Sequence, residues 1–370
     1  MRARQLGACL LLLGLAACGG GGGGPDSPAD DEAGLTRLEL IGKRLFFDTS
    51  LSNPAGQSCA SCHDPETGSS GNFGSTAGVP FAADKATLGL RNTPTATYAS
   101  FTPPFTLASA EARPLARGGQ FLDGRAGTLE EQAGQPLFAA AEMNLSGPAQ
   151  LAERLAAAPY APLLREEFGD AIFASPALVL QSVTSALAAF ERTARFAPFS
   201  SRFDRWLAGE ATLSPLEMEG LALFADPATG NCAGCHAYDP NARAGSRPLF
   251  TDFGYYVLGV PRNPLIPANA DPAFFDLGPC GPKRDVSDAR LCGAFKVPTL
   301  RNVARKRAFM HNGVFTRLRD AVAFHARRDR FEPDLPAQYR GNVERDVVPS
   351  ELDDHQLDAI TAFLSSLDDQ

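Results

Sequence analysis

Apolar residues recur at helical spacing in two long segments, Leu178–Thr193 and Leu352–Leu367. Each segment closes one half of the chain. Each is matched by a shorter apolar lead-in, Gly42–Phe46 in the first half and Gly220–Phe224 in the second. The pattern predicts a mainly α fold in which each closing helix packs against its lead-in helix. Stretches rich in Pro and Gly, such as residues 243–282, predict long loops between the helices.

The N-terminus carries an apolar run that is too short to cross a bilayer. Leu6–Ala17 is twelve residues long, whereas a membrane-spanning helix needs about 20. We therefore interpret residues 1–17 as a signal peptide for export. The run ends in Leu-Ala-Ala-Cys, which has the form of a bacterial lipobox, so Cys18 is predicted to become the lipidated first residue of the mature chain. An ordinary cleaved signal peptide is the alternative.

Composition favours a protein of two domains behind a flexible tether. Residues 18–34 begin with Cys18 and a run of glycines at 19–24, and they form the predicted tether. The remaining chain is long enough for two domains of ordinary size, which we expect at 35–200 and 201–370. The net charge is −8 and no long basic stripe occurs, so a nucleic-acid partner is not expected.

The strongest signal is a repeated motif, Cys-x-x-Cys-His, at 59–63 and again at 232–236. Two thiols three positions apart can add to the two vinyl groups of a haem, and the next His then ligates the iron. A structural zinc site would need four such ligands brought together. The predicted attachment residues are Cys59, Cys62, Cys232 and Cys235, and the predicted proximal ligands are His63 and His236. We therefore expect two covalently bound haem c groups.

Cys9 lies in the predicted signal peptide, and two cysteines remain after these assignments, Cys280 and Cys292. An exported protein resides in an oxidising compartment, where neighbouring cysteines pair. We therefore predict a disulfide between them.

Several longer strings resemble the bacterial dihaem cytochrome c peroxidase and MauG family. They are Arg91–Thr95, Gln120–Ala126, Leu129–Ala133, Phe295–Val303 and Met310–Gly313. The resemblance covers nearly all of the mature chain. It implies two cytochrome c-like haem domains with long loops, a peroxide-reactive N-terminal haem and an electron-transferring C-terminal haem.

The first half contains no His other than His63, so a base that moves protons between peroxide oxygens must be a carboxylate or a weaker group. Thr128 and Glu131 have the spacing of a capping box, which gives Glu131 a structural role at the start of a helix. Glu130 is then the neighbouring carboxylate without a predicted structural role. The resemblance places the catalytic distal Glu at Glu130 and a distal-pocket Gln at Gln120.

Three features depart from the family. Typical members carry a blocking His after the first motif, but residues 64–90 contain neither His nor Met, which predicts an open N-terminal haem iron. The resemblance also implies a calcium site between the domains at Asn92 and two backbone carbonyls. Those carbonyls belong here to Lys306 and Ala308 instead of the family's Thr and Pro, and a lysine beside a cation does not favour the site. The family's inter-haem Trp is absent. Aromatic alternatives for its place are Tyr98, Phe101 and Phe105.

The resemblance places the second ligand of the C-terminal haem fourteen residues after His311, at His325. The family carries Met or Tyr there. Weaker candidates are His311 itself and Met310. His355 lies on the polar face of the last helix, so we expect it to face solvent.

The combined interpretation is a dihaem peroxidase that reduces hydrogen peroxide with electrons from a small cytochrome c or cupredoxin. One alternative is a MauG-type oxidase that uses peroxide to modify a partner protein, and another is an electron carrier without enzymatic activity. In each case we expect the protein in the periplasm, held to the membrane by the lipid on Cys18.

Overall fold

The structure of the chain is a computed structural model. It describes residues 32–108, 115–238, 247–284, 286–344 and 351–370. The chain divides into a short first unit, Met1–Leu35, and a second unit, Thr36–Gln370, which contains all the elements discussed below. The expected signal peptide, the lipobox at Cys18 and most of the tether lie outside the described residues.

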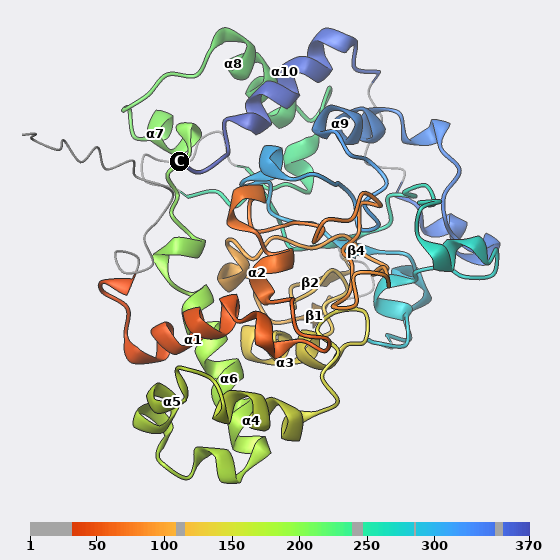
Figure 1. The fold of residues 1–370 in the computed structure, drawn as a ribbon. Helices are drawn as coiled ribbons and strands as arrows, with labels where there is room; N and C mark the ends of the chain where they lie inside the picture. Colours follow the sequence, from red (N-terminus) through yellow and green to blue (C-terminus); the bar gives the residue numbers. More distant parts are fainter. Residues whose placement is uncertain (1–31, 109–114, 239–246, 285, 345–350) are drawn as a thin grey trace, which may run out of the picture. The chain divides into compact units, whose positions relative to one another are not determined.

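The second unit is mainly helical, as the sequence predicts (Figure 1). Its helices are α1 (Arg37–Phe47), α2 (Cys59–Cys62), α3 (Leu129–Phe138), α4 (Pro148–Ala156), α5 (Ala161–Phe168), α6 (Pro176–Glu191), α7 (Arg202–Leu207), α8 (Pro215–Ala225), α9 (Leu318–Ala326) and α10 (Asp354–Ser365). Two antiparallel pairs of very short strands, β1 (Thr106–Leu107) with β2 (Ala116–Arg117) and β3 (Tyr255–Tyr256) with β4 (Phe295–Lys296), complete it.

Both lead-in helices begin at a capping box. Thr36 caps α1, and the Glu39 carboxylate accepts a hydrogen bond from the Thr36 backbone N–H at 2.7 Å. Ser214 and Glu217 form the same arrangement at the start of α8. These polar pairs satisfy N–H groups that the first turn of a helix cannot bond internally. The two modules therefore begin in the same way.

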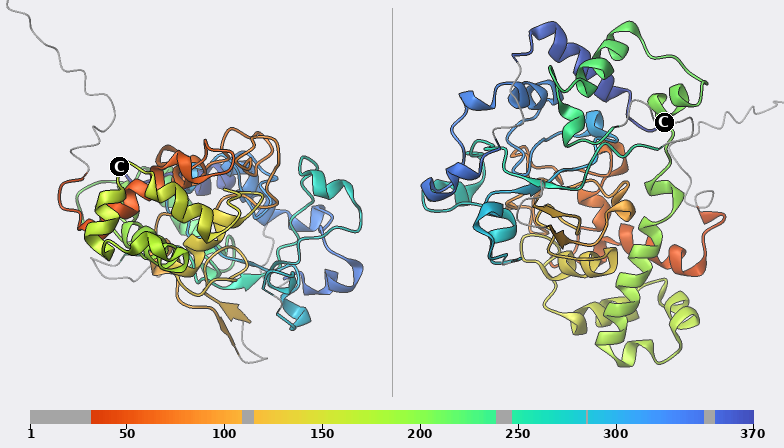
Figure 2. Two further views of the ribbon diagram at one scale, coloured as in Figure 1. Left: turned by 60° about the horizontal axis from the view of Figure 1, so that its bottom comes forward. Right: turned by 180° about the vertical axis from the view of Figure 1, so that it is seen from behind.

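The predicted closing helices are confirmed as α6 and α10, and each packs against its lead-in, α6 on α1 and α10 on α8. The crossings are tight because a glycine lies at each one. Gly42 of α1 faces the backbone of Ala186, and Gly220 of α8 faces the backbone of Ala359. A Cβ atom at either glycine would lie closer than 3.0 Å to the opposing helix. Helix α6 also contacts α3 and α4 (Figure 2).

Each helix pair lies in its own apolar cluster. The first cluster is drawn from residues between Ile41 and Phe196 and includes Leu45, Phe46 and Phe190. The second is drawn from residues between Phe203 and Leu367 and includes Phe224 and Phe363. Burial of such side chains is the main favourable contribution to folding, at about 1.5–3 kcal/mol each.

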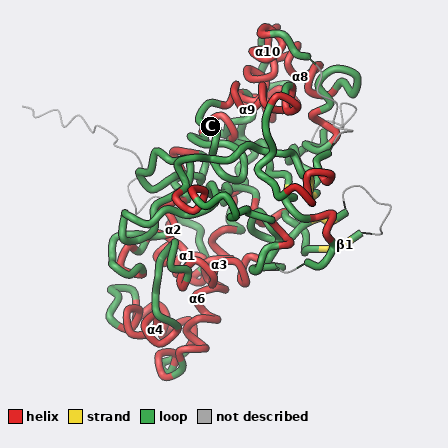
Figure 3. The backbone as a smooth tube through the Cα atoms, turned by 90° about the vertical axis from the view of Figure 1, so that its right-hand side faces the viewer, coloured by secondary structure: helices red, strands yellow, loops and turns green. Residues whose placement is uncertain are grey.

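Loops make up much of the remaining backbone and lie between the two helix pairs (Figure 3). The Cys280–Cys292 disulfide joins two such loop segments, which confirms the predicted pairing. Within the described ranges no helix is both long and apolar enough to cross a membrane.

Candidate functional site

The first Cys-x-x-Cys-His motif forms the single turn α2, and His63 follows directly at its C-terminal end. The imidazole Nδ1 of His63 lies 3.1 Å from the carbonyl oxygen of Ser69. A carbonyl only accepts, so Nδ1 carries the proton and Nε2 keeps a free lone pair. Desolvation lowers the pKa of His63, which favours the neutral ring that a metal requires.

The second motif repeats this geometry. His236 Nδ1 lies 3.0 Å from the carbonyl oxygen of Phe250, so its Nε2 is also free. Desolvation lowers the pKa of His236 to about 4. The four cysteines of the two motifs are not disulfide-bonded. Each motif thus presents two thiols and one correctly polarised imidazole, the donor set that covalent haem attachment needs.

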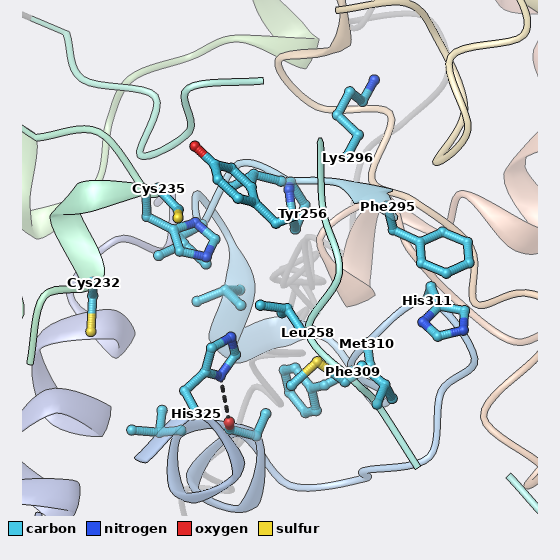
Figure 4. A pocket seen from close by; sticks show the side chains of 18 of the residues that line it. Cys232, Cys235, Tyr256, Leu258, Phe295, Lys296, Phe309, Met310, His311 and His325 are labelled. Carbon is cyan, nitrogen blue, oxygen red and sulfur yellow. Dashed lines mark hydrogen bonds between the residues drawn. The ribbon is translucent and has the colours of Figure 1, made fainter. Parts of the chain in front are cut away.

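His236 lies in a cavity of about 240 Å³ that we call the His236 cavity (Figure 4). His325 projects into it from α9 and is fixed by its Nδ1, which lies 2.8 Å from the carbonyl oxygen of Ala321. After desolvation, the charge of His325 is the next cause of the low pKa of His236, and both residues line the same cavity. The fold therefore brings together the two histidines that the sequence selects as ligands of one iron.

The two weaker candidates line the same cavity. His311 stacks on Phe295 with 3.7 Å between ring centroids and an interplanar angle of 10°, and Figure 4 shows this pair away from His325. In the same view, Met310 lies between His311 and His325. His355 is exposed at 66% of its side chain and contacts Glu219, as expected for a surface histidine.

His63 lines a second, smaller cavity of about 80 Å³, which we call the His63 cavity. Gln120, the predicted distal glutamine, lines it as well, and its Nε2 donates to the carbonyl oxygen of Ala99 at 3.1 Å. Among the described residues of its wall there is no second His and no Met. The two cavities therefore differ: His236, His311 and His325 line the first, and among described residues only one histidine, His63, lines the second.

Glu130, the predicted catalytic base, is not among the residues that line the His63 cavity. Its carboxylate binds Arg192, with 2.6 Å between Oε1 and Nη1, and its side chain is 36% exposed. The hydrogen bond from Arg192 is the main cause that lowers the pKa of Glu130. Its neighbour Leu129 does line the cavity, whereas the Glu130 carboxylate is paired with Arg192. Its catalytic role stays a prediction.

The capping box predicted for α3 forms only in part. Thr128 accepts a hydrogen bond from the Glu131 backbone N–H at 3.2 Å, as expected. The Glu131 carboxylate, however, binds the backbone N–H of Gly127 at 2.6 Å instead of that of Thr128. Glu131 therefore still has the structural role that the sequence assigns to it.

The two cavities share one wall. It consists of residues 94–95, Leu122 and residues 296–299, which line both. These positions fall within three of the strings that carry the family resemblance. Tyr98 lines the His63 cavity, but its hydroxyl is occupied by Asp369 at 2.7 Å. Phe101 and Phe105 line neither cavity, so the described wall gives no aromatic replacement for the missing Trp.

The residues named for calcium make hydrogen bonds within the protein, and the calcium site stays a prediction. The Asn92 side-chain amide donates to the carbonyl oxygen of Ala308 at 2.8 Å, so this oxygen faces a donor. The Lys306 ammonium donates to the Ser70 hydroxyl at 2.6 Å and to the Thr93 carbonyl oxygen at 3.2 Å. A calcium site needs six to eight oxygen ligands directed at the cation. Of the oxygens named for calcium, that of Ala308 accepts from the Asn92 amide, whereas the Lys306 ammonium binds oxygens of Ser70 and Thr93.

The sequence did not single out Glu191, the last residue of α6, which is buried and lines the His63 cavity. The spacing along the helix could have identified it. Glu191 lies four residues after Leu187 and eight after Val183, both buried core residues of the same helix, so it falls on the inward-facing side. A charged residue at an inward-facing helical position is uncommon and often functional.

Comparison with known proteins agrees with this arrangement. A family model for di-haem cytochrome c peroxidase matches residues 36–212. The methylamine utilization protein MauG of Paracoccus denitrificans is 36% identical over 98% of this chain and 95% of its own length. The chain belongs to the dihaem cytochrome c peroxidase and MauG family. Two haem c groups are therefore implied, and the motifs described above fit them.

Relatives with other names belong to the same group. The cytochrome c551 peroxidase of Nitrosomonas europaea is 30% identical over 86% of this chain and 80% of its own length. Among solved structures, the diheme peroxidase BthA of Burkholderia thailandensis superposes with a TM-score of 0.81 at 38% identity, covering 90% of this chain and 86% of BthA. The family thus includes both peroxidases and MauG proteins, and its members are oxidoreductases.

Proposed function

We propose that this protein reduces hydrogen peroxide to water with electrons from a small redox protein, a cytochrome c or a cupredoxin. The observation that carries the proposal is the difference between the two cavities. His63 has no second His or Met among the described residues that line its cavity, whereas His236 and His325 line one cavity together. A peroxide-cleaving iron needs an open position, and an electron-transferring iron works with both positions filled.

The proposed residue roles follow from the contacts. Cys59, Cys62, Cys232 and Cys235 attach the two haems, His63 ligates the first iron, and His236 with His325 ligates the second. When bound, the haems supply the electrons that reduce the peroxide bond. The protein keeps each proximal imidazole neutral and aimed through a backbone carbonyl, at Ser69 for His63 and at Phe250 for His236.

Gln120 and Glu130 are proposed to handle the peroxide itself. Gln120 lines the His63 cavity and could hold the substrate by hydrogen bonds. Glu130 follows Leu129 of the cavity wall, and Arg192 favours its ionised carboxylate, the form that can accept a proton. A positioned base of this kind contributes about 10²–10⁴-fold to a proton-transfer step.

We also propose two haem domains, at 35–200 and 201–370. The two separate apolar clusters and the two matched helix pairs support this division. The protein would act in the periplasm, where peroxidases and their donor proteins can meet. A lipid on Cys18 would hold it at the membrane, with residues 18–34 as the tether.

The second candidate is a MauG-type oxidase that uses peroxide to modify a partner protein. Two observations favour it: residues 64–90 lack the blocking His of typical peroxidases, and a MauG protein is 36% identical over almost the whole chain. An electron carrier without enzymatic activity is the third candidate. It explains the asymmetry of the cavities least well, because a carrier gains nothing from an open iron.

Steady-state turnover separates these candidates. The holoprotein is mixed with reduced cytochrome c and hydrogen peroxide, and oxidation of the cytochrome is followed. A peroxidase oxidises two cytochromes for each peroxide consumed. A MauG-type enzyme consumes peroxide without matching cytochrome oxidation, and a carrier accelerates neither process.

A further inference from the structure

Lys306, from the second half of the chain, reaches the loop of the first half that holds His63. Its ammonium donates to the hydroxyl oxygen of Ser70 at 2.6 Å and to the carbonyl oxygen of Thr93 at 3.2 Å. Ser70 directly follows Ser69, whose carbonyl oxygen lies 3.1 Å from Nδ1 of His63. The ammonium therefore contacts the loop that aims the first proximal imidazole.

The same lysine borders the second haem site. Lys306 is half-buried and lines the His236 cavity. Its charge is also felt at the first site: desolvation lowers the pKa of His63, and the charge of Lys306 lowers it further. One positive charge thus acts on both haem sites.

No carboxylate among the described residues counters this charge. Both hydrogen-bond acceptors of the ammonium are neutral oxygens. Burial lowers the pKa of Lys306 to about 8, and no acid of the described chain raises it again. Lys296, which lines both cavities, differs, because the charge of Asp123 opposes the effect of its burial. Withdrawing an unpaired charge from water is costly, and a methionine would fill the same space without that cost.

The physical effect of such a charge on a haem is defined. Ferric iron carries one more positive charge than ferrous iron, so a fixed positive charge nearby disfavours the ferric state. The effect is larger for a half-buried charge than for a surface charge, because water and salt screen it less. Charge and burial around a haem are among the means by which a protein sets its reduction potential.

We propose that Lys306 is the residue that tunes the two haems together: its ammonium raises the reduction potentials of the haem at His63 and of the haem at His236. The proposal rests on the proposed two-haem function and deepens it by naming a residue that regulates electron entry. Each iron gains one electron from the redox donor, and no covalent bond forms or breaks. Lys306 acts on this step only through its charge.

The test is a redox titration of the holoprotein, followed by the visible absorption of both haems, without peroxide. Lys306→Met keeps the length of the side chain and removes the charge. At a fixed applied potential, the ratio of ferric to ferrous iron should rise about tenfold at each haem, the order expected for one charge in a protein interior. For a one-electron couple this is a shift of about 59 mV to lower potential.

Two further variants separate charge from packing. Lys306→Arg keeps the charge, so both potentials should stay near those of the wild type. If Lys306→Met does not load both haems, Lys306→Gln, which still carries a hydrogen-bond donor, is titrated in its place. Arg307→Met is the matched control. It also removes one positive charge, but Arg307 is exposed and lines neither cavity, so screening by solvent should leave both potentials unchanged.

The outcomes are distinct. If Lys306→Met titrates at the wild-type potentials, the proposal is overturned. It is also overturned if Lys306→Arg falls as far as Lys306→Met, because the charge is then not the cause, or if only one haem shifts, because the charge is then not shared. None of these titrations contains peroxide. A wild-type protein that fails to turn over peroxide would refute the proposed function and leave the result for Lys306 intact.

Discussion

The close helix crossings make a sharp prediction about stability. In Gly220→Ala, the new Cβ would lie 2.5 Å from the carbonyl carbon of Ala359, where an ordinary contact is at least 3.4 Å. Helices α8 and α10 would therefore have to separate by about 1 Å in a packed core, and overpacking of this kind costs typically 1–3 kcal/mol. The better helix propensity of Ala returns up to about 1 kcal/mol. We expect a net loss of roughly 1–2 kcal/mol.

The same reasoning applies to the first module, which gives an internal repeat of the experiment. In Gly42→Ala the Cβ would lie 2.7 Å from the carbonyl carbon of Ala186, so a similar loss is expected. Gly134→Ala is the control, because its nearest neighbour is a side-chain methyl of Thr184 at 3.3 Å. There the propensity gain should dominate, and the change should be neutral or stabilising by up to about 1 kcal/mol.

Unfolding of the holoproteins in guanidinium, followed by far-ultraviolet circular dichroism, measures the free energy of unfolding of the wild type and of all three variants. The slope of the transition should stay constant, so that midpoints can be converted into free energies. If Gly220→Ala and Gly42→Ala unfold at the wild-type midpoint while Gly134→Ala does as well, the helices are not held at the distance described, and the reasoning is refuted.

Three further predictions concern the site. His325→Ala should convert the low-spin haem to high-spin or shift its potential, whereas His311→Ala should keep the coordination; electron paramagnetic resonance checks both, and the reverse pattern would reassign the ligand. Glu130→Gln should lower peroxide turnover by about 10²–10⁴-fold with both haems retained, while Glu131→Gln should change it little; equal rates in the two variants would remove Glu130 from the mechanism. A calcium chelator should leave turnover and spin states unchanged because Lys306 already donates to the oxygens nearby, and a loss that added calcium restores would contradict this.

Much of the fold could be predicted because its signals are local. Helical periodicity located α6 and α10 to within a few residues, and the duplicated motif anticipated two matching helix pairs. The pairing of Cys280 with Cys292 followed from the accounting of cysteines. These features depend on spacing along the chain, which a sequence displays directly.

The polar chemistry of the His63 cavity was harder to predict because it depends on tertiary contacts. Whether Glu130 or Glu191 faces the cavity is decided by the packing of α3 against α6, and by which of the two binds Arg192. The shared wall of the cavities likewise joins residues 94–95 to residues 296–299, about two hundred positions apart. No local pattern encodes such a juxtaposition.

The central claim is that one haem iron is open and the other is closed by two histidines. Low-temperature electron paramagnetic resonance of the untreated ferric holoprotein tests it most directly. We expect one high-spin signal, from the haem at His63, and one low-spin signal, from the haem between His236 and His325, in equal amounts. Two low-spin signals would show that a further residue closes the first iron, and the account of a peroxide-ready site would then be wrong.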